Sequence, residues 1–321
     1  MANQSNMNTS DIVKGSSLTK DAFRRLRNNK MSLASAIILL AIILICFLGP
    51  LLLPLAHPNH QDLTNIAASP SFAHPFGTDQ LGRDLFVRVL YGGRISLLVG
   101  AVATCVSLII GVTYGLISGY VGGKTDAVLM RIVDVLFALP FIVLVIVFSL
   151  SIEEPSRVAT QWIVETFGLP LETVSPIMSL IPLFIAIGAL GWLTLARIVR
   201  TQTIELKNQE FVEAARSLGL GWATILFKHI APNLLGVVIV YTTLAVPGIM
   251  LLEAVLSFLG LGVRAPNSSW GTLIKEGADR MEVSPELLLF PALLFSLTLL
   301  SLNFLGDGLR DALDPKSSKK Q

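Results

Sequence analysis

The sequence predicts an all-α polytopic membrane protein with six transmembrane helices. Hydrophobic residues make up 53% of its 321 residues and charged residues only 14%, whereas about a quarter of an average soluble chain is charged. The apolar residues gather in six runs, each long enough to cross a hydrocarbon layer of about 30 Å as a helix. One long polar segment separates the fourth run from the fifth.

A polar N-terminal tail at residues 1–31 precedes the first apolar run, residues 32–53. The basic end of the tail is expected to stay in the cytoplasm, and the run is too long for the apolar core of a signal peptide, so we predict a signal anchor. We assign residues 32–93 to this first span and an extracytoplasmic loop. Residues 83–91 of that loop are expected to form an amphipathic helix.

Five further spans and a cytoplasmic tail follow. They are expected at residues 95–118, 127–150, 177–199, 230–261 and 286–305, with the tail at 307–321. A proline removes a backbone hydrogen bond and favours a kink, and the last four spans each contain one: Pro140, Pro182, Pro247 and Pro291. An inside N-terminus places most of the 24 lysine and arginine residues in inside segments, which supports six spans with both termini in the cytoplasm.

The polar segment between the fourth and fifth spans, residues 205–233, is predicted to form two short helices that meet at a glycine corner. Four residues at helical spacing would form one apolar face: Phe211, Ala214, Ala215 and Leu218. Gly219 and Gly221 follow, where a helix end and a turn favour glycine. A short amphipathic helix on a membrane-anchored stem suits insertion into a groove of a partner protein. An ordinary cytoplasmic helical hairpin is the alternative.

A known family matches the details of this segment. Glu213-Ala214-Ala215, with Gly219 six residues after the glutamate and Pro232 near the end, resembles the "EAA" coupling loop of ABC importer permeases. The general pattern has isoleucine where His229 stands and leucine where Ala231 stands. These departures resemble the peptide-transporting branch of the family.

Three further blocks resemble the second permease subunit of dipeptide and oligopeptide importers: residues 74–97, 191–200 and 306–315. Together with the coupling loop, the resemblance covers about residues 20–316. It implies the type I ABC importer permease fold with an extra N-terminal span. It also implies a permease core at residues 94–306 that contains a cytoplasmic coupling loop at residues 201–229.

The resemblance implies a function as well. The chain would be a permease subunit of an ATP-driven importer in the bacterial inner membrane. With a homologous permease it would form the pathway for di- or oligopeptides, which a periplasmic or lipid-anchored substrate-binding protein delivers. Two ATPase subunits, which bind ATP and Mg²⁺, would contact Phe211, Glu213, Ala214, Ala215, Leu218 and Gly219. The chain would contact membrane lipid and no nucleic acid. Import of nickel or another small solute is one alternative, and an ion-coupled secondary transporter is another.

Glu253 stands inside the fifth predicted span with apolar residues on both sides. Ionisable residues in a span face the bundle interior or a water-filled path, because exposure to lipid is costly. Glu253 would therefore lie near the translocation path or its outer gate, or would form an ion pair or a hydrogen bond to the backbone of a neighbouring helix. Elsewhere in the spans, Asp134 is expected to pair with Arg131 one turn earlier, and Asn303 to hydrogen-bond across helices.

We predict neither a catalytic residue nor a cofactor bound by this chain. Residues 118–125 look like a phosphate-binding loop, but Ser118 replaces the required first glycine and a predicted span precedes the segment where a strand is needed. His57 and His60 have the spacing of a metal pair. No helix or strand is predicted to fix them and no cysteine supports them, so we predict no metal site.

Overall fold

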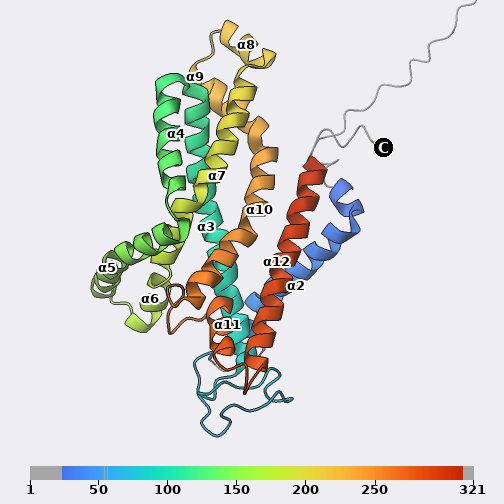
Figure 1. The fold of residues 1–321 in the computed structure, drawn as a ribbon, viewed down its shortest axis with the longest axis vertical. Coiled ribbons are helices and arrows are strands. Elements are labelled where there is room, and N and C mark those ends of the chain that lie inside the picture. The colour runs from blue at the N-terminus through green and yellow to red at the C-terminus, as the bar shows by residue number, and fades with distance from the viewer. Residues whose placement is uncertain (1–23, 54, 56, 314–321) are drawn as a thin grey trace, which may run out of the picture.

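The computed structural model describes residues 24–53, 55 and 57–313, which form a helical bundle (Figure 1). The helices are α2 (Lys30–Leu52), α3 (Leu85–Val121), α4 (Gly123–Ala138), α5 (Phe141–Phe167), α6 (Leu171–Met178), α7 (Ile181–Lys207), α8 (Glu210–Ser217), α9 (Trp222–Thr224), α10 (Ala231–Phe258), α11 (Trp270–Ala278) and α12 (Glu286–Leu313). A π-helical segment, η1 (Ile225–Ile230), joins α9 to α10. Most of the predicted N-terminal tail and the tail beyond Leu313 lie outside the described residues.

Five helical segments of the described chain are long and apolar enough to cross a membrane: Lys30–Leu52, Leu85–Val121, Leu171–Lys207, Trp222–Phe258 and Glu286–Leu313. The pair α4 and α5 passes the same test together, although it is bent by 97° at its break, and it makes a sixth span if it is counted as one. The predicted all-helical, multi-span architecture is therefore confirmed. The described chain therefore has five continuous candidate spans and one bent pair of helices in place of the sixth.

The interruption predicted at Pro140 in the third span, residues 127–150, is confirmed. α4 ends at Ala138 and α5 begins at Phe141. Leu139 is extended, with a ψ of 146°, because a residue before proline is disfavoured in the α region. The sharp bend therefore follows from the proline at position 140.

The other predicted proline interruptions have different outcomes. Pro182 lies in the first turn of α7, where its missing N–H would have no helical partner. The predicted fourth span, residues 177–199, is interrupted just before it, between the end of α6 at Met178 and the start of α7 at Ile181. Pro247 and Pro291 do lie inside α10 and α12. The predicted tail boundary at residue 307 also falls inside a helix, because α12 continues to Leu313.

Helix α3 is longer than the predicted second span and includes most of the amphipathic segment predicted at residues 83–91. The adjacent Gly92 and Gly93 do not break it, because close packing requires a small residue here. A Cβ atom on Gly93 would lie 2.6 Å from the Sγ atom of Cys46 and 2.7 Å from the ring of Trp270. The domain boundary predicted between residues 93 and 94 therefore lies inside a continuous helix.

The N-terminal span, α2, packs on α12 and α3 (Figure 1). Near its start, the Ser32 hydroxyl donates a hydrogen bond to the Phe304 carbonyl oxygen at 3.2 Å. Further along, Leu39 and Cys46 join a buried cluster that includes Trp270 and Phe295. α3 and α7 form the most extensive helix pair of the bundle. The extra span thus packs at the side of the bundle, against α12 and α3, and the pair of α3 and α7 forms the centre of the remaining helices.

A proline inside α2 is compensated by a side chain from α3. Pro50 has no N–H group, so it cannot bond the carbonyl of Cys46 four residues earlier. Arg94 donates from Nε to the Cys46 carbonyl oxygen at 2.7 Å and from a second guanidinium nitrogen to the Phe47 carbonyl oxygen at 2.6 Å. The arginine thereby satisfies a carbonyl that would otherwise be unbonded in an apolar region.

We expect Arg94→Met to destabilise the protein by about 1.5–3 kcal/mol, the usual contribution of a hydrogen bond to a charged group. In a Pro50→Ala background the loss should be smaller, because the new N–H at position 50 can bond Cys46. The measurement is a double-mutant cycle of thermal unfolding in detergent, with Arg94→Lys as the charge-retaining control. Equal losses in both backgrounds would contradict the compensation.

Candidate functional site

The predicted coupling segment lies at one end of the bundle, and α11 with the loop between α2 and α3 lies at the other (Figure 1). α8 begins at Glu210 and ends at a left-handed glycine. Gly219 has a φ of +76°, and its N–H bonds the Arg216 carbonyl oxygen at 2.9 Å. The Leu220 N–H bonds the Ala215 carbonyl oxygen at 3.2 Å. These two bonds form a Schellman motif, so glycine ends α8 as the sequence predicts.

The apolar face predicted for α8 is divided between two surroundings. Ala215 is buried, but Phe211, Ala214 and Leu218 face outward, with Phe211 40% and Leu218 81% exposed. The four residues therefore do not share the same surroundings. Val212, which sequence reasoning missed, is fully buried beside Ala215 in a cluster with η1. The three-residue spacing of Val212 and Ala215 was the available signal.

The corner after α8 adds to this exposed apolar surface. Trp222 is 66% and Phe227 is 62% exposed, and both follow Gly219 within the same connection. Glu213 is also exposed, in the first turn of α8, where a carboxylate interacts favourably with the helix dipole. We call the exposed residues Phe211, Glu213, Ala214, Leu218 and Gly219 the coupling surface. α8 is thus fixed by its inner face and displays the coupling surface at the end of the bundle.

Ion pairs tie α7, which leads into α8, to its neighbour α4. Arg197 pairs with Asp134 at 2.7 Å and lies over the ring of Phe137. Arg200 pairs with Asp126. The predicted pairing of Asp134 with Arg131 is therefore wrong, because the packing of α7 on α4 brings Arg197 to Asp134 from the adjacent helix. The predicted cross-helix bond of Asn303 is also wrong, since its amide donates to the Leu299 carbonyl oxygen of its own helix.

Glu253 lies in α10 and is fully buried. Its carboxylate accepts hydrogen bonds from the hydroxyls of Ser257 at 2.7 Å and Ser96 of α3 at 3.2 Å. The Ser96 hydroxyl in turn accepts from the Trp270 N–H at the start of α11. The partner on the neighbouring helix is thus a side-chain hydroxyl and not the predicted helix backbone, and a role of Glu253 in the translocation path stays a prediction.

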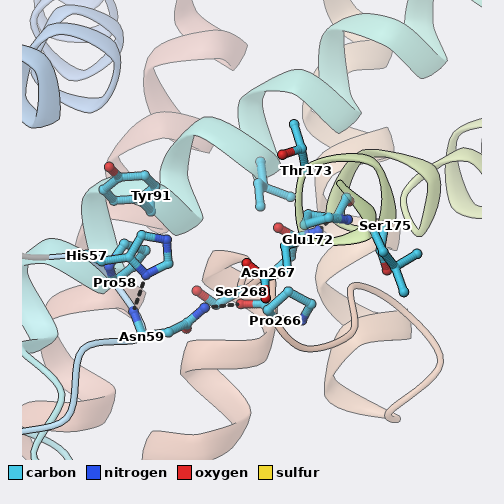
Figure 2. A pocket seen from close by; sticks show the side chains of 13 residues that line it. His57, Pro58, Asn59, Tyr91, Glu172, Thr173, Ser175, Pro266, Asn267 and Ser268 are labelled. Carbon is cyan, nitrogen blue, oxygen red and sulfur yellow. Dashed lines mark hydrogen bonds between the residues drawn. The ribbon is translucent and has the colours of Figure 1, made fainter. Parts of the chain in front are cut away.

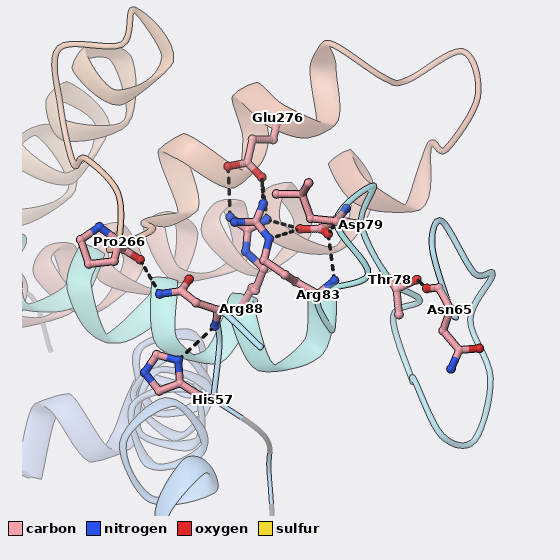
Figure 3. A network of polar contacts seen from close by, with 10 residues as sticks. His57, Asn65, Thr78, Asp79, Arg83, Arg88, Pro266 and Glu276 are labelled. Atoms are coloured by element: carbon pink, nitrogen blue, oxygen red, sulfur yellow. Dashed lines mark hydrogen bonds and ion pairs between the residues drawn. The ribbon is translucent and has the colours of Figure 1, made fainter. Parts of the chain in front are cut away.

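At the other end, an ionic network attaches the loop between α2 and α3 to the bundle (Figure 3). Arg88 of α3 is 3% exposed and donates to Asp79 of the loop at 2.8 Å. Two of its nitrogens also donate to the two carboxylate oxygens of Glu276 in α11, at 2.6 and 3.0 Å. Asp79 is 5% exposed and accepts a further bond from Arg83 at 2.7 Å. The network therefore joins the loop, α3 and α11.

Farther out in the same loop, Asp62 forms a local turn. Hydrogen bonds from the side chains of Thr64 and Asn65, and from the Thr64 N–H, lower the pKa of Asp62 to about 2. Its carboxylate therefore stays ionised under all ordinary conditions. Within the described residues, the side-chain hydrogen bonds of Asp62 stay inside the loop, so Asp62, unlike Asp79, does not attach the loop to α3 or α11.

A cavity of about 720 Å³ opens where the loop between α2 and α3 meets the rest of the bundle (Figure 2). His57 and Asn59 of the loop and Tyr91 of α3 lie on one side, and Glu172 of α6 lies across from them. Pro266 lies between the two sides, and its carbonyl oxygen accepts a hydrogen bond from the Asn59 amide at 3.1 Å. The cavity is thus assembled from four separate parts of the chain.

A smaller cavity of about 370 Å³ lies beside the first, and Leu171 and Ser175 line both. Three ionised side chains line the smaller cavity: Glu153, Arg157 and Arg264. Arg264 pairs with Glu153, and Arg157 pairs with Glu154. Its charges are therefore already matched within the chain.

The predicted non-sites can also be located. Among the described residues, no group of three or more His, Cys, Asp or Glu side chains could hold a metal ion. The His57 ring accepts a hydrogen bond from the Asn59 N–H at 3.3 Å. The segment at residues 118–125 is the turn between α3 and α4, so a helix precedes it where a phosphate-binding loop would have a strand.

Comparisons with known proteins extend these observations. Residues 111–319 match the family described as binding-protein-dependent transport system inner membrane component, and residues 17–71 match the N-terminal transmembrane domain of oligopeptide transport permease C. The oligopeptide transport system permease protein OppC of Haemophilus influenzae is 49% identical over 95% of this chain and 90% of its own length. The protein of the same name from Escherichia coli K12 is 46% identical over 95% and 93%. The dipeptide transport system permease protein DppC of Bacillus subtilis is 41% identical over 98% and 91%.

Proposed function

The chain belongs to the family of binding-protein-dependent transport system inner membrane components, and from that premise we propose that it is a permease subunit of an ATP-driven importer of di- and oligopeptides. The relatives named above are oligopeptide and dipeptide permeases that cover nearly the whole chain. Nickel import and ion-coupled secondary transport are not favoured by these relatives. The type I importer fold with an extra N-terminal span, predicted from the sequence, agrees with both matched families.

The observation that carries the proposal is the coupling surface. α8 is anchored through buried Val212 and Ala215 and exposes Phe211 and Leu218 to solvent. Large apolar side chains held outward on a rigid short helix suit a groove on a partner protein. The partners proposed here are two ATPase subunits, which bind ATP and Mg²⁺ and transmit their closure to the bundle through α8. The chain itself performs no covalent chemistry in this scheme.

The same arrangement supports an orientation. Ser32 near the start of α2 donates a hydrogen bond to Phe304 in the C-terminal half of α12, so these parts of the two helices lie together. Figure 1 shows the end of α12 pointing toward the α8 end of the bundle, away from α11. We place both termini and the coupling surface in the cytoplasm. The outer loop and α11 then face the substrate-binding protein, and a homologous permease completes the pathway.

Peptide uptake tests the function directly. Cells that lack this chain should lose uptake of labelled trialanine and regain it when the wild-type chain is expressed. The physical reason is that the pathway through the membrane requires both permeases. Normal trialanine uptake without the chain, together with a loss of nickel uptake, would contradict the proposal and favour the other solute class.

A further inference from the structure

The outer cavity of about 720 Å³ has an unusual balance of charge. Glu172 is the one carboxylate among the described residues that line it, and no described lysine or arginine lines it. Glu172 is exposed and has neither an ion pair nor a side-chain hydrogen bond within the described residues. The adjoining smaller cavity differs, since each of its ionised side chains has a partner. The larger cavity therefore presents an unmatched negative charge.

Besides Glu172, the cavity is lined by two asparagine amides and by hydroxyl groups, which can both donate and accept: Tyr91, Thr173, Ser175 and Ser268. The side-chain amides of Asn59 and Asn267 donate to the carbonyl oxygens of Pro266 and Pro176, at 3.1 and 2.6 Å. At least one N–H of each amide therefore holds the walls together, and each amide oxygen remains as an acceptor. Figure 2 shows Asn267 beside Glu172 and Asn59 on the opposite side of the same opening. A ligand with hydrogen-bond donors and a positive charge therefore matches Glu172 and the two amide oxygens.

A primary ammonium group has this chemistry, with three N–H donors and no acceptor. A metal ion is a poor match, because no group of three or more His, Cys, Asp or Glu side chains among the described residues could hold one. The volume of about 720 Å³ lies within the usual range for small-ligand sites. Tyr91 and Pro266 supply apolar surface for the remainder of a short peptide.

We propose that this cavity receives the amino-terminal ammonium group of a peptide on its way into the pathway, with Glu172 as its anchor. The inference rests on the proposed peptide import and adds a binding site to it. A partly exposed ion pair is weak, at about 0.2–1 kcal/mol. Weak binding suits a transport pathway, because a solute must leave the site as readily as it enters. The site is built partly from the N-terminal extension, through Asn59, and partly from the core, through α6.

The test measures uptake by the complete transporter, assembled with its partner subunits and binding protein in proteoliposomes. Glu172→Gln should lower the initial rate of trialanine uptake at subsaturating concentration about 1.4- to fivefold. Uptake of N-acetyl-trialanine should be the same in the wild type and the variant. Trialanine amide, which keeps its amino terminus, should lose as much as trialanine. The binding protein is identical in every arm, so its own selectivity cancels from the comparison.

Two further arms sharpen the result. Glu165→Gln removes an exposed carboxylate of α5 that does not line the cavity, and it should leave all rates unchanged. N-acetyl-Ala-Lys-Ala carries its ammonium on a side chain, and its uptake should not change in Glu172→Gln. If its uptake falls as much as that of trialanine, the site binds any ammonium group of a peptide, and the assignment to the amino terminus is overturned. An unchanged ratio of trialanine to N-acetyl-trialanine uptake in Glu172→Gln overturns the inference alone. Failure of the wild-type transporter to take up trialanine overturns the proposed function and the inference with it.

Discussion

Gly219→Asp is expected to lower peptide uptake by more than a hundredfold while the chain stays in the membrane at its normal amount. Aspartate tolerates the left-handed region better than most residues, and a Cβ atom on Gly219 meets nothing within 4 Å, so the fold should survive. The new carboxylate would stand beside exposed Leu218, at the negative end of the α8 dipole. Burying an unpaired charge in a docked interface costs several kcal/mol, and each 1.4 kcal/mol is a factor of ten.

Two controls separate charge from backbone. Gly219→Asn has nearly the same shape and also tolerates a positive φ, so it should retain much more uptake than Gly219→Asp. Gly123→Asp places the same charge on another glycine with a positive φ, +56°, and open surroundings, in the turn between α3 and α4. It should transport nearly normally. Equal losses in all three variants would show that the effect is not specific to the coupling surface.

Asp79→Ala is expected to release the outer loop from the bundle. The substitution removes the loop's carboxylate and leaves the guanidinium of Arg88, which is 3% exposed, with Glu276 as its remaining ionic partner. Breaking a buried ion pair by removing one partner costs about 3–5 kcal/mol. If that cost is paid by local opening of the loop, trypsin cleavage after Arg83 should accelerate by at least about a hundredfold.

Asp62→Ala is the matched control for this experiment. Asp62 lies in the same loop and is also a hydrogen-bonded carboxylate, but its bonds go to Thr64 and Asn65 within the loop. Its loss should change cleavage after Arg83 only slightly. Cleavage that accelerates equally in both variants would mean that the network in Figure 3 does not hold the loop.

The sequence predicts well what depends on local chemistry. Apolar runs locate the spans because their length is set by the bilayer. Gly219 locates the end of α8 because glycine is favoured where φ is positive. Pro140 locates the break between α4 and α5 for a similar reason, although a 97° bend exceeds an ordinary kink. These features need no knowledge of distant residues.

What the sequence does not predict depends on contacts between distant segments. Local spacing suggests Arg131 for Asp134, but packing of α7 on α4 brings Arg197 to 2.7 Å. From the sequence alone, the glycine pair at 92–93 suggests the end of a helix. In the structure it lies within α3, where Cys46 and Trp270 leave no room beside Gly93 for a larger side chain. Likewise, Val212 is buried while Phe211 is exposed because η1 packs against Val212. Neither cavity can be predicted from the sequence, because each is lined by several segments that are far apart in the chain.

The central claim is that the coupling surface binds an ATP-hydrolysing partner. The most direct measurement is the ATPase activity that co-purifies with the affinity-tagged chain from its native membrane in mild detergent, per mole of chain. Activity should co-purify with the wild type and with Gly123→Asp, and should be lost with Gly219→Asp. A wild-type chain that purifies without ATPase activity, or a Gly219→Asp chain that keeps all of it, would contradict the claim.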